Sequence, residues 1–191
     1  PSPTPTPTPP AVKWAQPPNM IDGYDIPSWR DKEGQVDIVV ADDWECLDGQ
    51  PIVKIRWWGS YEGWMKDTPE PVEPPDVRPI AFRLSWHKYK EGPPYSTPGE
   101  LIAEEYCTNF SEKWYGSVRL WYEPNSFEHE FVYECVLQEP WKQVKGEKYF
   151  LNIQAVYDTP EVKFPWGWKN SEKHWNDDAV QWQNGEWIEL V

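Results

Sequence analysis

Tryptophans in polar or turn-rich surroundings are the residues of this sequence whose chemistry is most specific. The chain has 15 tryptophans among 191 residues. The flat face of an indole stacks on the C–H face of a sugar ring, which adds about 1 kcal/mol per ring beyond burial. Two or three such platforms, with polar side chains around them, would give a micromolar to millimolar dissociation constant. The candidates for ligand contact are Trp58, Trp64, Trp114, Trp121, Trp141 and Trp166, together with Arg56 and Arg119.

Four of these candidates form two pairs, each with a tryptophan and an arginine on one strand face. In the run Ile52–Trp58, alternation puts Arg56 and Trp58 on the same side. That side suits either a sugar-binding strand face or an edge where the indole covers the guanidinium. Arg119 and Trp121 are also two residues apart, which is ~7 Å along a strand. Both pairs are therefore expected to be accessible.

The other candidates lie next to turn-forming or polar residues. Trp64 follows Gly63, Trp114 follows a polar run, and Trp141 and Trp166 each follow a proline. The alternative for every candidate is a place in a tryptophan-rich core. That alternative is the expectation for the tryptophans whose strand phase or motif is apolar: Trp44, Trp57, Trp86, Trp168 and Trp175.

Two compact groups of acidic residues could hold a metal ion. Asp42 and Asp43 are adjacent, and Asp177 and Asp178 follow Asn176. Calcium takes six to eight oxygen ligands, many of them from loop carboxylates. The spacing differs from that of an EF-hand, and capping of turns by Asp and Asn is the alternative. We expect no required cofactor, and a structural calcium ion if these four aspartates meet.

Motifs for catalysis are scarce. The sequence has no HExxH, no GxSxG, and no glycine-rich phosphate or dinucleotide loop. A pair of carboxylates ~5–10 Å apart would suffice for glycoside hydrolysis. With 32 acidic residues such a pair is open, but the sequence nominates no particular one.

These side chains need elements to position them, and the pattern predicts strands. Proline is frequent, with 22 residues, and no long stretch keeps a helical period. Period-two alternation predicts roughly nine strands, little helix and an antiparallel β-sandwich of jelly-roll type. The predicted strands are 35–41, 52–58, 80–86, 101–107, 117–122, 131–137, 149–157, 179–182 and 187–190. Residues 67–79, with five prolines, are predicted to be an exposed loop.

The phase of three strands predicts their buried faces. In 80–86, the even-numbered residues Ile80 to Trp86 are expected to face the core. The strand 131–137 is expected to be buried on both faces, because Glu134 is its main polar residue. In 149–157, the odd-numbered Leu151 to Ala155 are expected inside, with Asn152 and Gln154 outside.

Composition limits the partners. The net charge is −14, from 32 acidic and 18 basic residues, which disfavours nucleic acid and anionic membranes. No apolar run approaches the ~20 residues of a membrane span. The Pro/Thr repeat of residues 1–10 reads as an extended linker, followed by one domain over 11–191. Three cysteines, at 46, 107 and 135, allow either one disulfide with one free thiol or three reduced thiols.

Five short motifs, in a fixed order, resemble a known family. They are Lys13-Trp-Ala-Gln-Pro-Pro18, Ala41-Asp-Asp-Trp-Glu-Cys46, Ile52 to Ser60, Gly167-Trp-Lys169 and His174-Trp-Asn-Asp-Asp-Ala-Val180. Together they are similar to a domain of unknown function in secreted or surface proteins of environmental bacteria, planctomycetes among them. The resemblance implies a β-rich fold and an extracellular location. The linker separately looks like those that join catalytic domains to carbohydrate-binding modules.

Taken together, the sequence predicts a non-catalytic carbohydrate-binding module for a plant-type polysaccharide such as cellulose, another β-glucan or a hemicellulose. The module would be secreted from a bacterium and tethered to an upstream enzyme or surface protein on the same chain. One alternative is a glycoside hydrolase or lyase that uses a carboxylate pair. A second alternative is a structural or interaction module of the cell surface.

Overall fold

The computed structural model describes residues 12–123, 125–173 and 175–190. The expected linker, residues 1–10, lies outside this range. The described residues form fourteen strands and no helix. None of them belongs to a helix with the length and apolar character that a membrane crossing requires. The strands are β1 Asp25–Pro27, β2 Trp29–Asp31, β3 Asp37–Ile38, β4 Val40–Glu45, β5 Ile52–Tyr61, β6 Met65–Lys66, β7 Ala81–Lys90, β8 Thr97–Cys107, β9 Ser111–Arg119, β10 Phe127–Trp141, β11 Lys148–Tyr157, β12 Trp166–Lys169, β13 Val180–Gln183 and β14 Glu186–Glu189.

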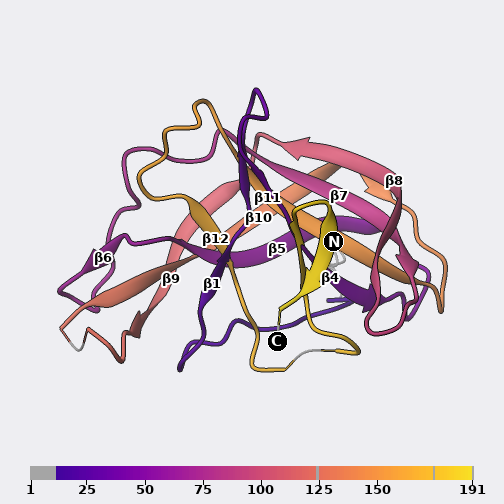
Figure 1. Cartoon of the computed structure of the whole chain (residues 1–191), viewed down its shortest axis with the longest axis horizontal. Helices are drawn as coiled ribbons and strands as arrows, with labels where there is room; N and C mark the ends of the chain where they lie inside the picture. Colours follow the sequence, from indigo (N-terminus) through magenta and orange to yellow (C-terminus); the bar gives the residue numbers. More distant parts are fainter. Residues whose placement is uncertain (1–11, 124, 174, 191) are drawn as a thin grey trace, which may run out of the picture.

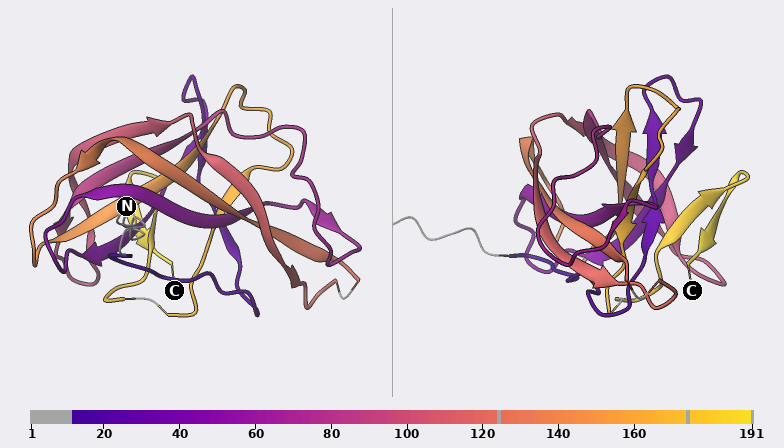
Figure 2. Two further views of the ribbon diagram at one scale, coloured as in Figure 1. Left: turned by 180° about the vertical axis from the view of Figure 1, so that it is seen from behind. Right: turned by 90° about the vertical axis from the view of Figure 1, so that its left-hand side faces the viewer.

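The strands form two sheets that pack face to face, as Figures 1 and 2 show. In the first sheet, β1, β12, β5 and β10 are neighbours in that order, β9 pairs with the far edge of β10, and β6 pairs with its start. In the second sheet β11 is central, with β7 and then β8 on one side. β4 and β2 pair with its other side, and β13 and β14 extend beyond β4. The predicted all-β sandwich is confirmed.

The strand count and the strand directions differ from the prediction. The structure has fourteen strands rather than nine. The five additional strands are β1, β2, β3, β6 and β12, which have two to four residues each, too few to show a clear alternation. One pairing is also parallel, between β2 and β11 over Ala155–Tyr157. The second sheet is therefore mixed rather than wholly antiparallel.

The core between the sheets consists mainly of aromatic rings. Trp57 on β5 lies with its ring centroid 5.0 Å from that of Phe82 on β7, and Phe82 lies 5.0 Å from Tyr133 on β10. At the other end of the sandwich, Trp86 stacks on Trp141 at 5.5 Å. Large rings at such separations add packing energy to their buried area, of about 0.5–1.5 kcal/mol per pair.

A disulfide between Cys107 on β8 and Cys135 on β10 joins the two sheets, and Cys46 is a free, buried thiol. Of the two alternatives for the cysteines, the structure therefore has one disulfide and one thiol.

The residues of β10 alternate between core and surface. Phe131, Tyr133 and Cys135 are buried, but Val136 is 71 % exposed and Glu134 is half-buried. The expectation that 131–137 is buried on both faces is wrong, because no further layer covers this part of the first sheet. On β5 the odd-numbered Ile55 and Trp57 face the core in the same way, so Lys54, Arg56 and Trp58 face outward.

Two other phase predictions are corrected in part. Phe82, Leu84 and Trp86 are buried as expected, but Ile80 lies outside β7 and is 49 % exposed. On β11, Asn152 and Gln154 were expected outside and are buried. Gln154 donates to Asp37 Oδ1 at 2.7 Å and to the Ile38 carbonyl at 2.9 Å. The short strand β3 of the same sheet therefore supplies the hydrogen bonds that the buried amide of Gln154 needs.

Candidate functional site

The outer surface of the first sheet carries a partly exposed aromatic pair. Trp58 on β5 and Tyr115 on β9 have ring centroids 5.9 Å apart, with an interplanar angle of 67°. Tyr115 is 45 % exposed, and Trp58 is half-buried. Val132 on β10 pairs with Trp58 and lies between the two strands. We call Trp58, Tyr115, Val132, Arg56 and Glu134 the aromatic face.

A bulge brings Tyr115 to this surface. Along the β9–β10 ladder, Phe131 pairs with Trp114 but Glu130 pairs with Gly116, so Tyr115 is the extra residue. Such a bulge re-aims a side chain. Here it places the phenol ring against Trp58 while Trp114 stays on the core side, where its Nε1 donates to His129 Nδ1 at 3.0 Å.

Charged groups border the aromatic face. Arg56 Nε donates to Glu134 Oε1 at 2.7 Å, and Lys54 Nζ lies 3.3 Å from the same oxygen. The hydrogen bond from Arg56 lowers the pKa of Glu134, with Lys54 adding to the effect. The face therefore combines two rings with a fixed carboxylate and two cations, which are the group types that can hydrogen-bond sugar hydroxyls.

Three of the predicted ligand-contact tryptophans are buried instead. Trp166 is fully buried, and Trp64 and Trp141 are 8 % and 9 % exposed. Trp64 packs against Tyr61 and Phe131, and Trp166 packs against Phe82 and Tyr133. The expectation that these three tryptophans contact ligand is wrong, because a preceding proline or glycine marks a turn in the backbone but not the direction of the side chain.

The remaining candidates are more accessible. Trp121 is 89 % exposed, in the loop between β9 and β10 rather than on a strand, and its ring contacts Tyr122. Arg119 ends β9 with its guanidinium 6.0 Å from the ring centre of Phe127. Trp114 is half-buried on the core side of β9. Of the eight candidates, only Trp58 and Arg56 belong to the aromatic face.

The four aspartates predicted to bind metal lie in one region. Asp43 Oδ2 accepts from Asn176 Nδ2 at 2.8 Å, and Asp177 Oδ2 accepts from the Ser96 amide at 2.9 Å. Burial and then the Asp43 carboxylate raise the pKa of Asp42 to about 7, with Asp178 adding to the effect. Burial raises the pKa of Asp43 to about 6. The calcium site stays a prediction, and amide N–H groups of Asn176 and Ser96 already partner two of these carboxylates.

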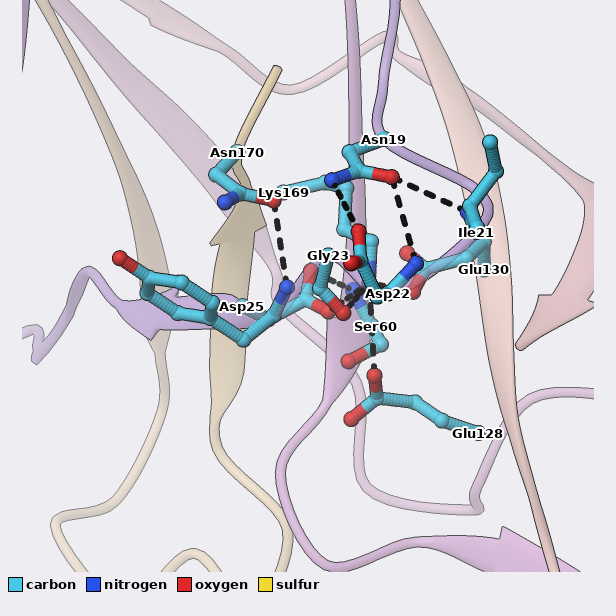
Figure 3. A network of polar contacts seen from close by, with 11 residues as sticks. Asn19, Ile21, Asp22, Gly23, Asp25, Ser60, Glu128, Glu130, Lys169 and Asn170 are labelled. Atoms are coloured by element: carbon cyan, nitrogen blue, oxygen red, sulfur yellow. Dashed lines mark hydrogen bonds and ion pairs between the residues drawn. The ribbon is translucent and has the colours of Figure 1, made fainter. Parts of the chain in front are cut away.

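A different group of carboxylates is the most compact in the described chain. Asp25, Glu128 and Glu130 each have an oxygen within 4.8 Å of the others. Lys169 lies among them: its Nζ is 3.0 Å from Asp25 Oδ2, 2.6 Å from Glu130 Oε1 and 3.4 Å from Glu128 Oε2 (Figure 3). These four residues are the buried charge cluster.

The register of four strands builds the buried charge cluster. Asp25 on β1 pairs directly with Lys169 on β12, and β12 pairs with β5 at Ser60. Glu128 and Glu130 alternate with the inward-facing His129 and Phe131 on β10. The cluster therefore occupies the same outer surface of the first sheet as the aromatic face, further along the strands.

A segment before β1 covers the cluster. The Asn19 amide donates to the Asn170 carbonyl at 2.9 Å, and Asn170 Oδ1 accepts from the Tyr24 amide at 3.1 Å. Gly23 carries no side chain here because a Cβ would lie 2.4 Å from the Asn19 carbonyl oxygen. The Gly23 carbonyl accepts from Lys169 Nζ at 3.0 Å. As a result the side chains of Lys169 and Glu130 are fully buried and that of Asp25 is 3 % exposed.

Burial and the excess of acids over bases set the protonation of the cluster. Burial, with the Glu130 carboxylate, raises the pKa of Asp25 to about 8, although Lys169 opposes this. Burial raises the pKa of Glu128 to about 7 and raises the pKa of Glu130. Burial alone would lower the pKa of Lys169. The three neighbouring acidic groups outweigh the effect of burial, so the pKa of Lys169 is raised. Near neutral pH the carboxyl group of Asp25 therefore holds a proton.

The sequence pattern did not predict the buried charge cluster. Asp25 and Lys169 are 144 residues apart, and alternation within one strand does not reveal such a pairing. His129 is fully buried, and burial lowers its pKa. For Tyr115, its position beside the candidate Trp114 and after the polar run 111–113 was the available signal.

Comparison with known proteins gives a family match. A family model described as "Domain of unknown function (DUF7901)" matches residues 12–191. No curated protein and no solved structure matches the chain.

Proposed function

The chain belongs to the DUF7901 family of domains of unknown function. We propose that it is a non-catalytic module that binds a neutral polysaccharide on the aromatic face. The observation that supports this is the partly exposed Trp58–Tyr115 pair on a sheet surface that also carries Arg56 and Glu134. A sheet surface of this kind offers an extended chain several contacts in a row.

The energetics suit weak binding of a polymer. Two rings supply about 1 kcal/mol each beyond their area, and Arg56, Lys54 and Glu134 offer donors and acceptors near them. A total near 4–7 kcal/mol corresponds to a dissociation constant between millimolar and micromolar. A tether to an upstream enzyme or surface protein would strengthen such binding through effective concentration.

The net charge and the disulfide fit this setting. A charge of −14 repels polyanions but leaves neutral glycans unaffected. Disulfides persist in oxidising compartments, so the Cys107–Cys135 bond supports export from the cell. We therefore propose a secreted or surface location and a plant-type β-glucan or hemicellulose as the ligand class.

The carboxylate cluster does not favour a hydrolase. Asp25, Glu128 and Glu130 are closer together than any other such group among the described residues, but the segment around Gly23 covers them. In a hydrolase the glycosidic bond lies between two acidic side chains. Here the space between the acidic side chains is occupied by the Lys169 ammonium group.

The test is binding of single variants to soluble and insoluble glycans. Affinity electrophoresis and isothermal titration should show binding to at least one of cellulose, xylan, mannan and mixed-linkage glucan. Trp58→Ala and Tyr115→Ala should each weaken it about fivefold, since 1.4 kcal/mol is tenfold in affinity. Trp182→Ala removes another exposed tryptophan, on β13 in the second sheet, and should leave binding unchanged.

Two outcomes would overturn the proposal. One is absence of binding to all four glycans at millimolar concentration. The other is a double variant at Trp58 and Tyr115 that is folded and binds like the parent. Trp121→Ala separates the aromatic face from the β9–β10 loop, because a loss confined to this variant would move the site to Trp121.

A further inference from the structure

Asp25 and Lys169 face each other on adjacent strands in a dry site. They are direct register partners on β1 and β12, and Lys169 Nζ lies 3.0 Å from Asp25 Oδ2. We propose that these two side chains condense into an intramolecular amide, which covalently links β1 to β12.

The reacting groups are already in contact. Asp25 Cγ is bonded to the oxygen that lies 3.0 Å from Nζ, and attack requires the nitrogen to approach that carbon to ~3–3.5 Å. The Gly23 carbonyl accepts from Nζ at 3.0 Å and orients it. Groups held in this way show effective molarities of ~10⁵–10⁸ M.

A donor is in place for the charge that develops on Asp25. The Ser60 amide donates to Asp25 Oδ1 at 3.0 Å. When Nζ adds to Cγ, negative charge grows on a carboxyl oxygen, and a fixed backbone N–H stabilises it as in an oxyanion hole. Oδ1 is then the oxygen that stays in the amide, and Oδ2 is the oxygen that leaves.

Glu130 is positioned to move the protons. Its Oε1 lies 2.6 Å from Nζ, so it can take a proton from the Lys169 ammonium and leave a neutral amine. The amine electron pair forms the N–Cγ bond with protonated Asp25. Glu130 returns its proton to Oδ2, which leaves as water, and Glu130 then takes the second proton from the nitrogen and keeps it. One carboxylic acid and one amine give one amide and one water, with no oxidant, reductant or cofactor.

The environment favours the amide over the ion pair. The side chain of Lys169 is fully buried, and three carboxylates share that one cation. Charges in such a site carry a desolvation cost, and formation of the amide removes the ammonium charge and leaves its proton on Glu130. The covering segment at Gly23 also excludes the water that would reverse the reaction.

The mass of the intact chain tests the proposal. After reduction and denaturation, the purified protein should be lighter than its sequence by one water. Tandem mass spectrometry of a digest should show the peptide containing Asp25 joined to the peptide containing Lys169. If protein purified in the folded state has the full sequence mass after reduction and denaturation, the proposal is overturned.

Variants separate the reaction from the fold. Lys169→Met and Asp25→Ala should both have the full sequence mass. Glu130→Gln keeps the shape of the side chain but removes its ability to accept a proton. The variant should fold, as measured by circular dichroism, and most of its molecules should lack the cross-link. A folded Glu130→Gln protein with complete cross-linking would remove Glu130 from the reaction. Lys148→Met, at a lysine that faces Trp175 and Tyr89, is the matched control and should keep the missing water.

Discussion

At Asp42, burial and a neighbouring carboxylate act in the same direction on a single side chain. They raise its pKa to about 7, well above the ordinary value of 3.8. A carboxyl group whose folded-state pKa is raised binds more protons when folded than when unfolded between those two pH values. Its contribution to stability is therefore present below about pH 4 and is lost as the pH rises through about 7.

Asp42→Asn should remove this pH dependence. The amide Oδ1 can still accept from the Asp43 amide, which now donates to Asp42 Oδ1 at 2.9 Å. Because Asp42 is half-buried, we expect a gain of about 1–2 kcal/mol near pH 8 and little change near pH 4. Urea unfolding of both proteins at the two pH values measures it. An equal effect at both values would contradict the assignment, and Asp158→Asn on the exposed surface is the control.

The pattern of residue types along single strands predicted two residues of the aromatic face, but it could not predict contacts that depend on how strands pair. Trp58 and Arg56 were placed correctly on one outward strand face, because alternation within one strand is a local property. Tyr115 depends on a bulge, and the contact of Lys169 with Asp25 depends on the pairing of strands from opposite ends of the chain. Neither register nor bulges can be read from one strand alone.

Among the elements, the disulfide between β8 and β10 should make a large contribution to stability. Cys107 and Cys135 close a loop of 28 residues, for which the chain-entropy model gives roughly 3–4 kcal/mol. Reduction with dithiothreitol should lower the urea midpoint accordingly. Cys46→Ala should show the same shift on reduction, because Cys46 is a free thiol. A protein insensitive to reduction, with thiol labelling confirming the reduced state, would contradict this.

Long strands were predicted and very short ones were not. The runs that became β5, β7, β8, β10 and β11 were all found from alternation, with their ends displaced by a few residues. The run 117–122 was placed too late: β9 ends at Arg119, and Trp121 lies in the following loop. β1 has three residues with no apolar pattern, and only its pairing with β12 makes it a strand.

For the molecule as a whole, the excess of acidic groups opposes folding. A net charge of −14 on one domain produces self-repulsion that salt screens, since the Debye length falls from about 30 Å at 0.01 M to about 8 Å at 0.15 M. The melting temperature should therefore rise by a few degrees over this range of sodium chloride. Glycan binding on the aromatic face should change little, because the ligand is neutral. A melting temperature that falls or stays constant would show that local ion pairs outweigh the net charge.

The pairing of β1 with β12 also decides how the domain carries tension. Asp25 is the first residue of β1 and Lys169 the last of β12, so the pair stands at the end of the ladder nearest the incoming chain. A pull from that side would reach Asp25 before any other strand residue. Hydrogen bonds of a three-residue strand would unzip one after another under such a load. With Asp25 anchored to Lys169, the load passes into β12 and on to β5, and the rest of the first sheet stays in register.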